Sequence, residues 1–166
     1  MKRLFVMISM FCMVSVIGFA QDLKWAAGVS FGYGSDISKP FIGVKAHYDI
    51  IDQLTIAPSF NYYFKDSEDL GYGESFDLNY WDVNVDLHWN LLHGERFNVY
   101  PFVGFTYLHA KASYEGESES DGKVGGNIGV GGQFNIASNW AVSVEAKYQI
   151  IDGGQFVPMA SIMYRF

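Results

Sequence analysis

The chain is short of cysteine, proline and charge, and these shortages exclude several classes of protein. It has one cysteine and four prolines in 166 residues, and only 17% of its residues are charged. A single cysteine excludes a disulfide scaffold. Disordered chains are rich in charge and poor in aromatic residues, whereas 17% of this chain is aromatic. The formal net charge of −7 argues against a nucleic-acid-binding protein, which would carry a basic surface.

The first twenty residues have the layout of a secretory signal peptide. A basic start, Lys2-Arg3, is followed by an uncharged run that ends in Gly18-Phe19-Ala20. This places small residues at the −3 and −1 positions of a cleavage site after Ala20. The run is shorter than the roughly 20 apolar residues that a membrane-spanning helix needs. We therefore expect residues 1–20 to be removed on export and residues 21–166 to form one domain.

The rest of the chain alternates between apolar and polar residues with a period of two. From Trp140 to Ile150 every second residue is apolar, and Glu145 and Lys147 lie between them. Such alternation indicates β-strand. It predicts eight strands, at about 24–34, 40–49, 54–65, 76–90, 97–112, 123–135, 140–150 and 156–166. Most exceed the five or six residues usual in soluble strands and match the roughly 9–11 that cross a bilayer at a slant.

Aromatic residues on the apolar face decide which way that face points. An eight-stranded barrel has room inside only for its own side chains, so large aromatic rings on most strands belong outside. With alternating strand direction the rings fall at two levels, as in the aromatic girdles of membrane barrels. The predicted girdle residues are Trp25, Trp81, Trp89, Trp140, Tyr148 and Phe166. The predicted fold is all-β, an eight-stranded antiparallel transmembrane up-and-down β-barrel.

Two segments resemble a known family. These are Tyr100–Phe105, which opens the fifth strand, and the closing segment Ala160–Phe166. They are similar to the small eight-stranded outer-membrane barrels of Gram-negative bacteria, of the OmpA, OmpX and OmpW types. The resemblance implies a protein of the outer membrane with periplasmic termini, in contact with the lipid bilayer and lipopolysaccharide. It also implies that the outer-membrane assembly machinery recognises the C-terminal strand through Phe166.

The polar face of the strands carries charges of both signs. Its residues are Lys45, His47, Asp49, Asp82, Asp86, His88, Glu145, Lys147 and Arg165. With Lys24 there are four basic and four acidic residues beside the two histidines. Buried charges persist when they are paired and hydrogen-bonded. We therefore interpret this set as a structural core that plugs the barrel, with a narrow proton or ion path as the alternative.

Two connections between strands are long and acidic. They cover residues 66–75 and 113–122. The candidate contact residues in them are Tyr72, Tyr114, Glu115, Glu117 and Glu119. The first interpretation is a solvated surface, and divalent-cation bridging to lipopolysaccharide or a partner is an alternative. The spacing of acidic residues from Glu115 onward is also compatible with a strand that extends past the membrane.

The sequence offers little for catalysis or metal binding. A serine hydrolase acting on lipid A needs a serine and a histidine in hydrogen-bond reach, but Lys111 occupies the position two residues after His109. His47 and His88 belong to strands separated by another strand. A shared metal ion is conceivable there, but nothing in the sequence supports it, and we predict no metal site and no cofactor. The predicted function is a non-enzymatic structural or interaction role in membrane integrity, adhesion or partner contact. A lipid A-modifying enzyme and a narrow channel are the alternatives.

Overall fold

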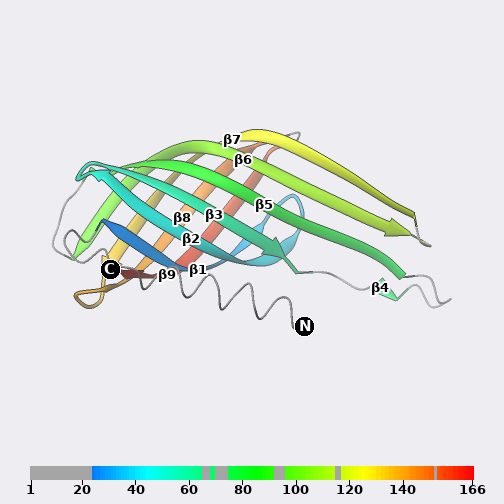
Figure 1. Ribbon diagram of the computed structural model, residues 1–166. Helices are drawn as coiled ribbons and strands as arrows, with labels where there is room; N and C mark the ends of the chain where they lie inside the picture. Colours follow the sequence, from blue (N-terminus) through cyan, green and yellow to red (C-terminus); the bar gives the residue numbers. More distant parts are fainter. Residues whose placement is uncertain (1–23, 65–67, 70–74, 92–95, 115–116, 152) are drawn as a thin grey trace.

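The computed structural model describes residues 24–64, 68–69, 75–91, 96–114, 117–151 and 153–166. These residues form strands and the connections between them (Figure 1). The strands are β1 (Trp25–Gly34), β2 (Lys39–Ile51), β3 (Leu54–Tyr63), β4 (Glu68–Asp69), β5 (Ser75–Trp89), β6 (Phe97–Tyr114), β7 (Glu117–Asn135), β8 (Trp140–Ile150) and β9 (Gln155–Arg165). Among the described residues, no helix is long and apolar enough to cross a membrane.

Eight of the described strands close into a barrel. The long strands that follow one another in the chain pair antiparallel, and β1 also pairs with β9, with Ser30 opposite Ser161. β3 pairs directly with β5, with Ser59 opposite Asn84, although the short β4 lies between them in the chain. β4 itself pairs only with the start of β5 in the described structure. The predicted eight-stranded antiparallel up-and-down barrel is confirmed.

The predicted strand bounds agree with the structure to within two residues, except at the start of β7. That strand begins at Glu117, six residues before the predicted position. Its ladder with β6 continues to the pair Tyr114 and Glu117. The acidic segment 113–122 is therefore largely strand, which was the alternative interpretation of its acidic spacing.

The two ends of the barrel differ. At one end, the turn rim, β1 begins, β9 ends, and short connections join β2 to β3, β5 to β6 and β7 to β8. At the other, the loop rim, β5, β6 and β7 continue past the remaining strands (Figure 1).

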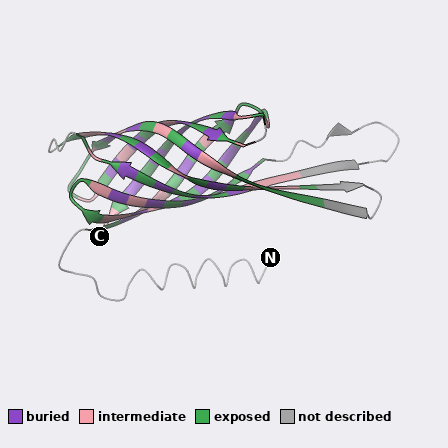
Figure 2. Cartoon of the chain, turned by 90° about the horizontal axis from the view of Figure 1, so that it is seen from above, coloured by how far each residue is buried: buried purple, intermediate pink, exposed green. Residues whose placement is uncertain are grey.

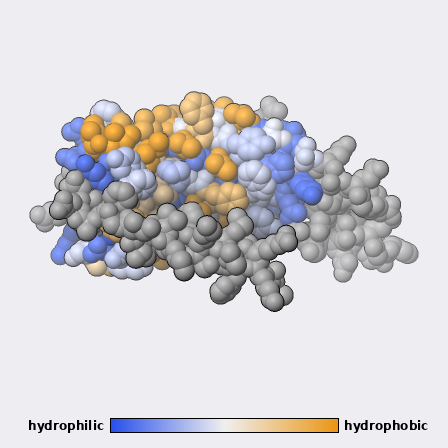
Figure 3. All heavy atoms as spheres, in the orientation of Figure 1, coloured by the Kyte–Doolittle hydropathy of each residue, from blue (hydrophilic) through white to orange (hydrophobic). Residues whose placement is uncertain are grey.

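Burial alternates along the strands in step with side-chain direction. On β8, Ser143 and Glu145 are buried, whereas Val144 between them is 63% exposed on the outer surface. The same alternation runs around the whole barrel (Figure 2). Apolar atoms gather over the middle of the visible outer face, and hydrophilic atoms lie toward its ends (Figure 3). The outer surface is thus apolar and the interior polar, the reverse of a water-soluble barrel.

All six predicted girdle residues lie on the outer face. Near the turn rim, the ring of Trp25 lies 4.5 Å from that of Tyr48, and the ring of Trp140 lies 5.1 Å from that of Tyr164. Nearer the loop rim, Trp81 lies between Phe60 on β3 and Tyr107 on β6. Trp89 and Phe166 face outward at the turn rim, and Tyr148 faces outward toward the loop rim.

A lysine scan along β8 tests whether the outer face meets lipid. Val144→Lys, near mid-height, should lower the free energy of unfolding by about 2–4 kcal/mol, because a charge at the bilayer midplane is costly. Ile150→Lys is the matched control, since Ile150 is on the same strand and face but at its end. It should cost at most about 1 kcal/mol. Urea unfolding in lipid vesicles measures both, and equal small costs would contradict a lipid-facing surface.

Candidate functional site

The predicted polar residues lie inside the barrel, on β2, β5, β8 and β9. Lys45, His47, Asp82, Asp86, His88, Glu145 and Lys147 are buried. Asp49 and Arg165 are partly exposed at the turn rim, where Arg165 Nη2 lies 3.9 Å from Asp49 Oδ2. Lys24, which alternation also places inward, is exposed just before β1.

One ion pair crosses the middle of the lumen. Lys45 Nζ on β2 donates a hydrogen bond to Glu145 Oε2 on β8, and both side chains are 1% exposed. The other carboxylate oxygen, Glu145 Oε1, accepts a hydrogen bond of 2.8 Å from the Tyr100 hydroxyl on β6. Because both oxygens have donors, the buried carboxylate is compensated as a buried charge must be.

A second group of polar side chains lies on the loop-rim side of this pair. Lys147 Nζ is 4.0 Å from Asp86 Oδ2 and donates a 2.9 Å hydrogen bond to Asn84 Oδ1. Asn127 Nδ2 on β7 donates to Asp86 Oδ1 at 2.7 Å. Gln149 Nε2 donates to Asn84 Oδ1 at 3.1 Å. Three side chains from β7 and β8 are therefore tied to β5.

Asp82 continues this network toward the loop rim. It is fully buried and accepts hydrogen bonds from the amides of Asn61 and Asn84, at 2.7 and 2.6 Å, on Oδ1. The Tyr63 hydroxyl donates to Oδ2 at 2.8 Å. The carboxylate is thus held by neutral donors on β3 and β5.

The buried phenylalanine and tyrosine rings of the described residues lie inside the barrel, and the alternation did not single them out. They are Phe41, Tyr63, Tyr100 and Phe102. A Cβ atom built on Gly131 would lie 2.4 Å from Tyr100 Cε2, and one on Gly129 would lie 2.4 Å from Phe102 Cζ. The glycines of β7 therefore make room for the rings of β6. The sequence signal was present, since Gly129 and Gly131 are inward positions on the neighbouring strand.

The two interior histidines lie together, although their strands are separated by β3 as the sequence predicts. Their ring centres are 5.1 Å apart, although His47 is on β2 and His88 on β5. His88 also stacks on Tyr100, with ring centres 4.5 Å apart and planes 9° apart. One ligand atom each from His47, His88 and Glu145 lies within 4.8 Å of the others. β2 and β5 lie on either side of β3 in the barrel wall, and their inward side chains meet in so narrow a lumen.

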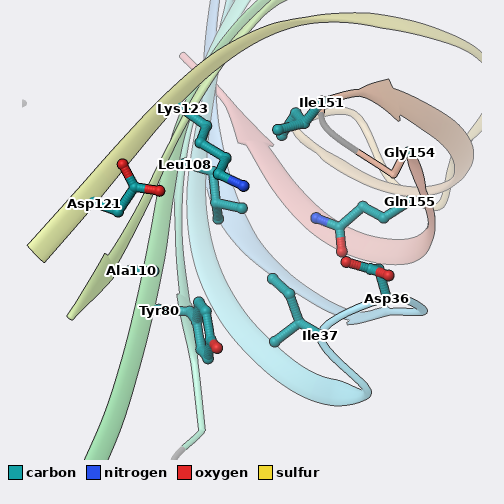
Figure 4. A pocket seen from close by; sticks show the side chains of 10 residues that line it. All are labelled: Asp36, Ile37, Tyr80, Leu108, Ala110, Asp121, Lys123, Ile151, Gly154 and Gln155. Atoms are coloured by element: carbon teal, nitrogen blue, oxygen red, sulfur yellow. The ribbon is translucent and has the colours of Figure 1, made fainter. Parts of the chain in front are cut away.

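A cavity opens into the interior at each rim. The turn-rim cavity has a volume of about 270 Å³ and includes His47, His88 and Tyr100 in its lining. The loop-rim cavity has a volume of about 310 Å³. In Figure 4, Lys123, Tyr80 and Gln155 converge on the loop-rim cavity from β7, β5 and β9.

His109, the histidine considered for a lipid A hydrolase, packs against aromatic rings on the described outer surface. The ring of His109 stacks on Trp81, with centres 4.8 Å apart, and lies 6.5 Å from the ring of Tyr107. Ser113 is in β6, but its side chain lies outside the described structure.

Several predictions concern residues that the structure does not describe. The signal peptide at residues 1–20, Tyr72 and Glu115 lie outside the described residues. Tyr114, Glu117 and Glu119 are placed in β6 and β7 by their backbone, but their side chains are outside the description.

Comparison with known families decides the class of protein. Residues 10–161 match the family model described as the outer membrane protein beta-barrel domain. The chain belongs to this family. It is therefore a β-barrel of the bacterial outer membrane. No curated protein matches it.

Solved structures share the fold at low sequence identity. The attachment invasion locus protein Ail of Yersinia pestis is 21% identical over 86% of this chain and 96% of its own, with a TM-score of 0.60. The N-terminal barrel of Pseudomonas aeruginosa OprF is 14% identical over 86% and 96% of the two chains, with a TM-score of 0.66. E. coli outer membrane protein W is 13% identical over 89% and 100%, with a TM-score of 0.53.

Removing one partner of the central ion pair tests its part in stability. Glu145→Gln should lower the free energy of unfolding by about 3–5 kcal/mol, because it leaves the buried Lys45 without a counter-charge. In Lys45→Met/Glu145→Gln part of this loss should be recovered, since neither charge remains.

Ser161→Ala is the control for that experiment. Ser161 is 2% exposed, and its Oγ has no hydrogen-bond partner among the described residues. Its removal should cost less than about 1 kcal/mol in the same urea unfolding assay. A similar cost for Glu145→Gln and Ser161→Ala would show that the ion pair contributes nothing specific.

Proposed function

We propose that this protein is a non-conducting outer-membrane barrel that holds a sheet outside the membrane for contact with a partner. The observation that carries the proposal is the continuation of β5, β6 and β7 past the end of β8. The ladder between β7 and β8 ends at Gly126 opposite Ile150, whereas β6 and β7 remain paired to Tyr114 and Glu117.

The projecting sheet consists of residues 75–80 of β5, 108–114 of β6 and 117–125 of β7. At about 3.4 Å per residue, this part of β7 extends roughly 30 Å along the strand. Within the described structure no ladder joins these residues of β7 to β8. An unpaired edge offers backbone donors and acceptors to another chain. A projecting sheet with a free edge is a means of contact and has no evident use in closing the barrel.

The asymmetry of the rims supports an orientation. Outer-membrane barrels have short periplasmic turns and longer extracellular connections. By this rule the turn rim, where β1 begins and β9 ends, faces the periplasm and the projecting sheet faces outward. Export through a signal peptide cleaved after Ala20, and recognition of the C-terminal strand by the assembly machinery, belong to the same proposal.

The interior supports the absence of conduction. The Lys45–Glu145 pair, the Tyr100 ring and the network around Asn84 lie between the two rim cavities. An eight-stranded barrel has no spare room beyond its own side chains. Ion passage would require these buried, paired groups to separate.

The charge of the projecting sheet indicates which kind of partner it would contact. Ail has been crystallised with the heparin analogue sucrose octasulfate. In this chain the distal part of the projecting sheet carries Glu117, Glu119 and Asp121 in sequence. These carboxylates disfavour a sulfated polysaccharide and favour a cationic partner, or lipopolysaccharide phosphates bridged by divalent cations. Tyr72, Tyr114 and Glu115 remain candidate contact residues.

Planar bilayers test the closed interior. The inserted protein should give no conductance steps above the baseline of the bilayer, because its lumen is filled by paired side chains. A porin with more strands serves as the positive control. Steps that Glu145→Ala or Lys147→Ala reduces would instead assign a narrow channel to the protein.

Shortening the projecting sheet tests the contact role. Replacing residues 113–122 with a two-residue turn should leave the amount of folded barrel unchanged and should abolish attachment of cells displaying the protein to matrix-coated surfaces. The matched control keeps the full length of β6 and β7 but replaces four acidic residues with the corresponding amides, namely Glu115, Glu117, Glu119 and Asp121. It distinguishes an effect of the shortened sheet from an effect of its lost negative charge. Undiminished attachment by the shortened protein would contradict the proposal.

A further inference from the structure

Two buried imidazoles meet at the inner end of the turn-rim cavity. His47 is 7% exposed and His88 is 1% exposed, and both line the cavity. They come from β2 and β5, which lie on either side of β3 in the barrel wall. The cavity therefore leads from the turn rim to a pair of nitrogen ligands.

Neither histidine has its Nε2 atom satisfied. His47 Nε2 and His88 Nε2 are buried without a hydrogen-bond partner among the described residues. Buried polar atoms in proteins are nearly always paired, and an unpaired one requires an explanation. The other buried polar atoms without a partner among the described residues are amide or hydroxyl oxygens, not imidazole nitrogens; they belong to Asn98, Asn127, Gln155, Ser143 and Ser161. Two unpaired imidazole nitrogens in one place are what a bound ion would use.

A carboxylate completes the cluster from the opposite wall. One ligand atom each of His47, His88 and Glu145 lies within 4.8 Å of the others. Ligand atoms on one tetrahedral Zn²⁺ lie about 3.3 Å apart, so modest side-chain rotations would bring these three onto one ion. Tyr100 already orients Glu145 through Oε1 and stacks on His88. One tyrosine thus positions two of the three ligands.

We propose that His47, His88 and Glu145 form a site for one divalent transition-metal ion of the Zn²⁺ class. Two imidazoles and a carboxylate suit such ions, whereas Mg²⁺ and Ca²⁺ prefer oxygen ligands alone. Asp49 and Asp52 line the entrance of the cavity, together with Arg165, which pairs with Asp49. The inference goes beyond the contact role, because the site lies in the lumen. A bound ion would connect β2, β5 and β8 across the barrel.

Lys45 is the competitor for this site. Its ammonium group holds Glu145 Oε2 and must release that oxygen before the ion can bind it. The site therefore makes an unusual prediction: removing a buried lysine should strengthen metal binding. Nonspecific binding to surface histidines would not respond to this change.

The test uses the full chain, folded in detergent. Its affinity for Zn²⁺, with no other ligand present, is measured by titration calorimetry. The chain has four histidines, so His93→Gln/His109→Gln provides a background in which only His47 and His88 remain. This background should bind one Zn²⁺. Adding His47→Gln or His88→Gln should weaken binding at least tenfold, and adding Lys45→Met should strengthen it severalfold.

The inference is overturned if the background chain binds no Zn²⁺, or if His47→Gln and His88→Gln leave the affinity unchanged. Should either variant fail to fold, electron paramagnetic resonance of Cu²⁺ bound to the background chain decides the question. Coupling to two imidazole nitrogens supports the site, and a spectrum with oxygen ligands alone overturns it. The absence of conductance and the attachment of cells are tested by separate experiments. A chain that binds no metal ion would therefore leave the proposed contact role standing.

Discussion

Closure of the antiparallel sheet is the constraint on which the rest of this structure depends. The ladders between β1 and β9 and between β3 and β5 leave the barrel wall without an edge. Backbone groups in a bilayer have no water to bond, so only a closed sheet can satisfy them. Once the sheet is closed, each inward position is enclosed and each outward position faces the surroundings. The alternation of polar and apolar residues then decides which surface is polar and which is apolar.

The interior of the barrel is filled by paired charged side chains and by aromatic rings that lie over glycines. Eight strands enclose too little space for large side chains on every strand, so the rings of β6 lie over glycines of β7. The remaining space holds paired charges such as Lys45 and Glu145, together with amides that bond to them. A polar interior is affordable here because few of its donors and acceptors are left unpaired. Among the exceptions in the described residues are the Nε2 atoms of the two adjacent histidines, His47 and His88.

Asymmetry between the rims gives the barrel a direction. The turn rim ends close to the aromatic rings of Trp25 and Trp140, while at the loop rim three strands continue outward. β5, β6 and β7 therefore form part of the barrel wall and also the projecting sheet. The contact sheet and the ion site that we propose lie toward opposite ends of the barrel, and neither requires the wall to open.

The sequence by itself determined the eight long strands, with the exception of the start of β7, and the alternation of inward and outward positions along them. These follow from local rules, because a period of two places alternate side chains on opposite faces. The bounds of β8 could be read directly from residues 140–150, and the family from the outer-membrane pattern as a whole.

Only the tertiary structure decided which inward residues meet. Pairing of Lys45 with Glu145, of Lys147 with Asp86, and of His47 with His88 depends on strand stagger and on the width of the closed barrel. The early start of β7 likewise depends on its ladder with β6, since acidic residues alternate equally well in a loop. Distances across the lumen join residues far apart in the chain, and no local pattern carries that information.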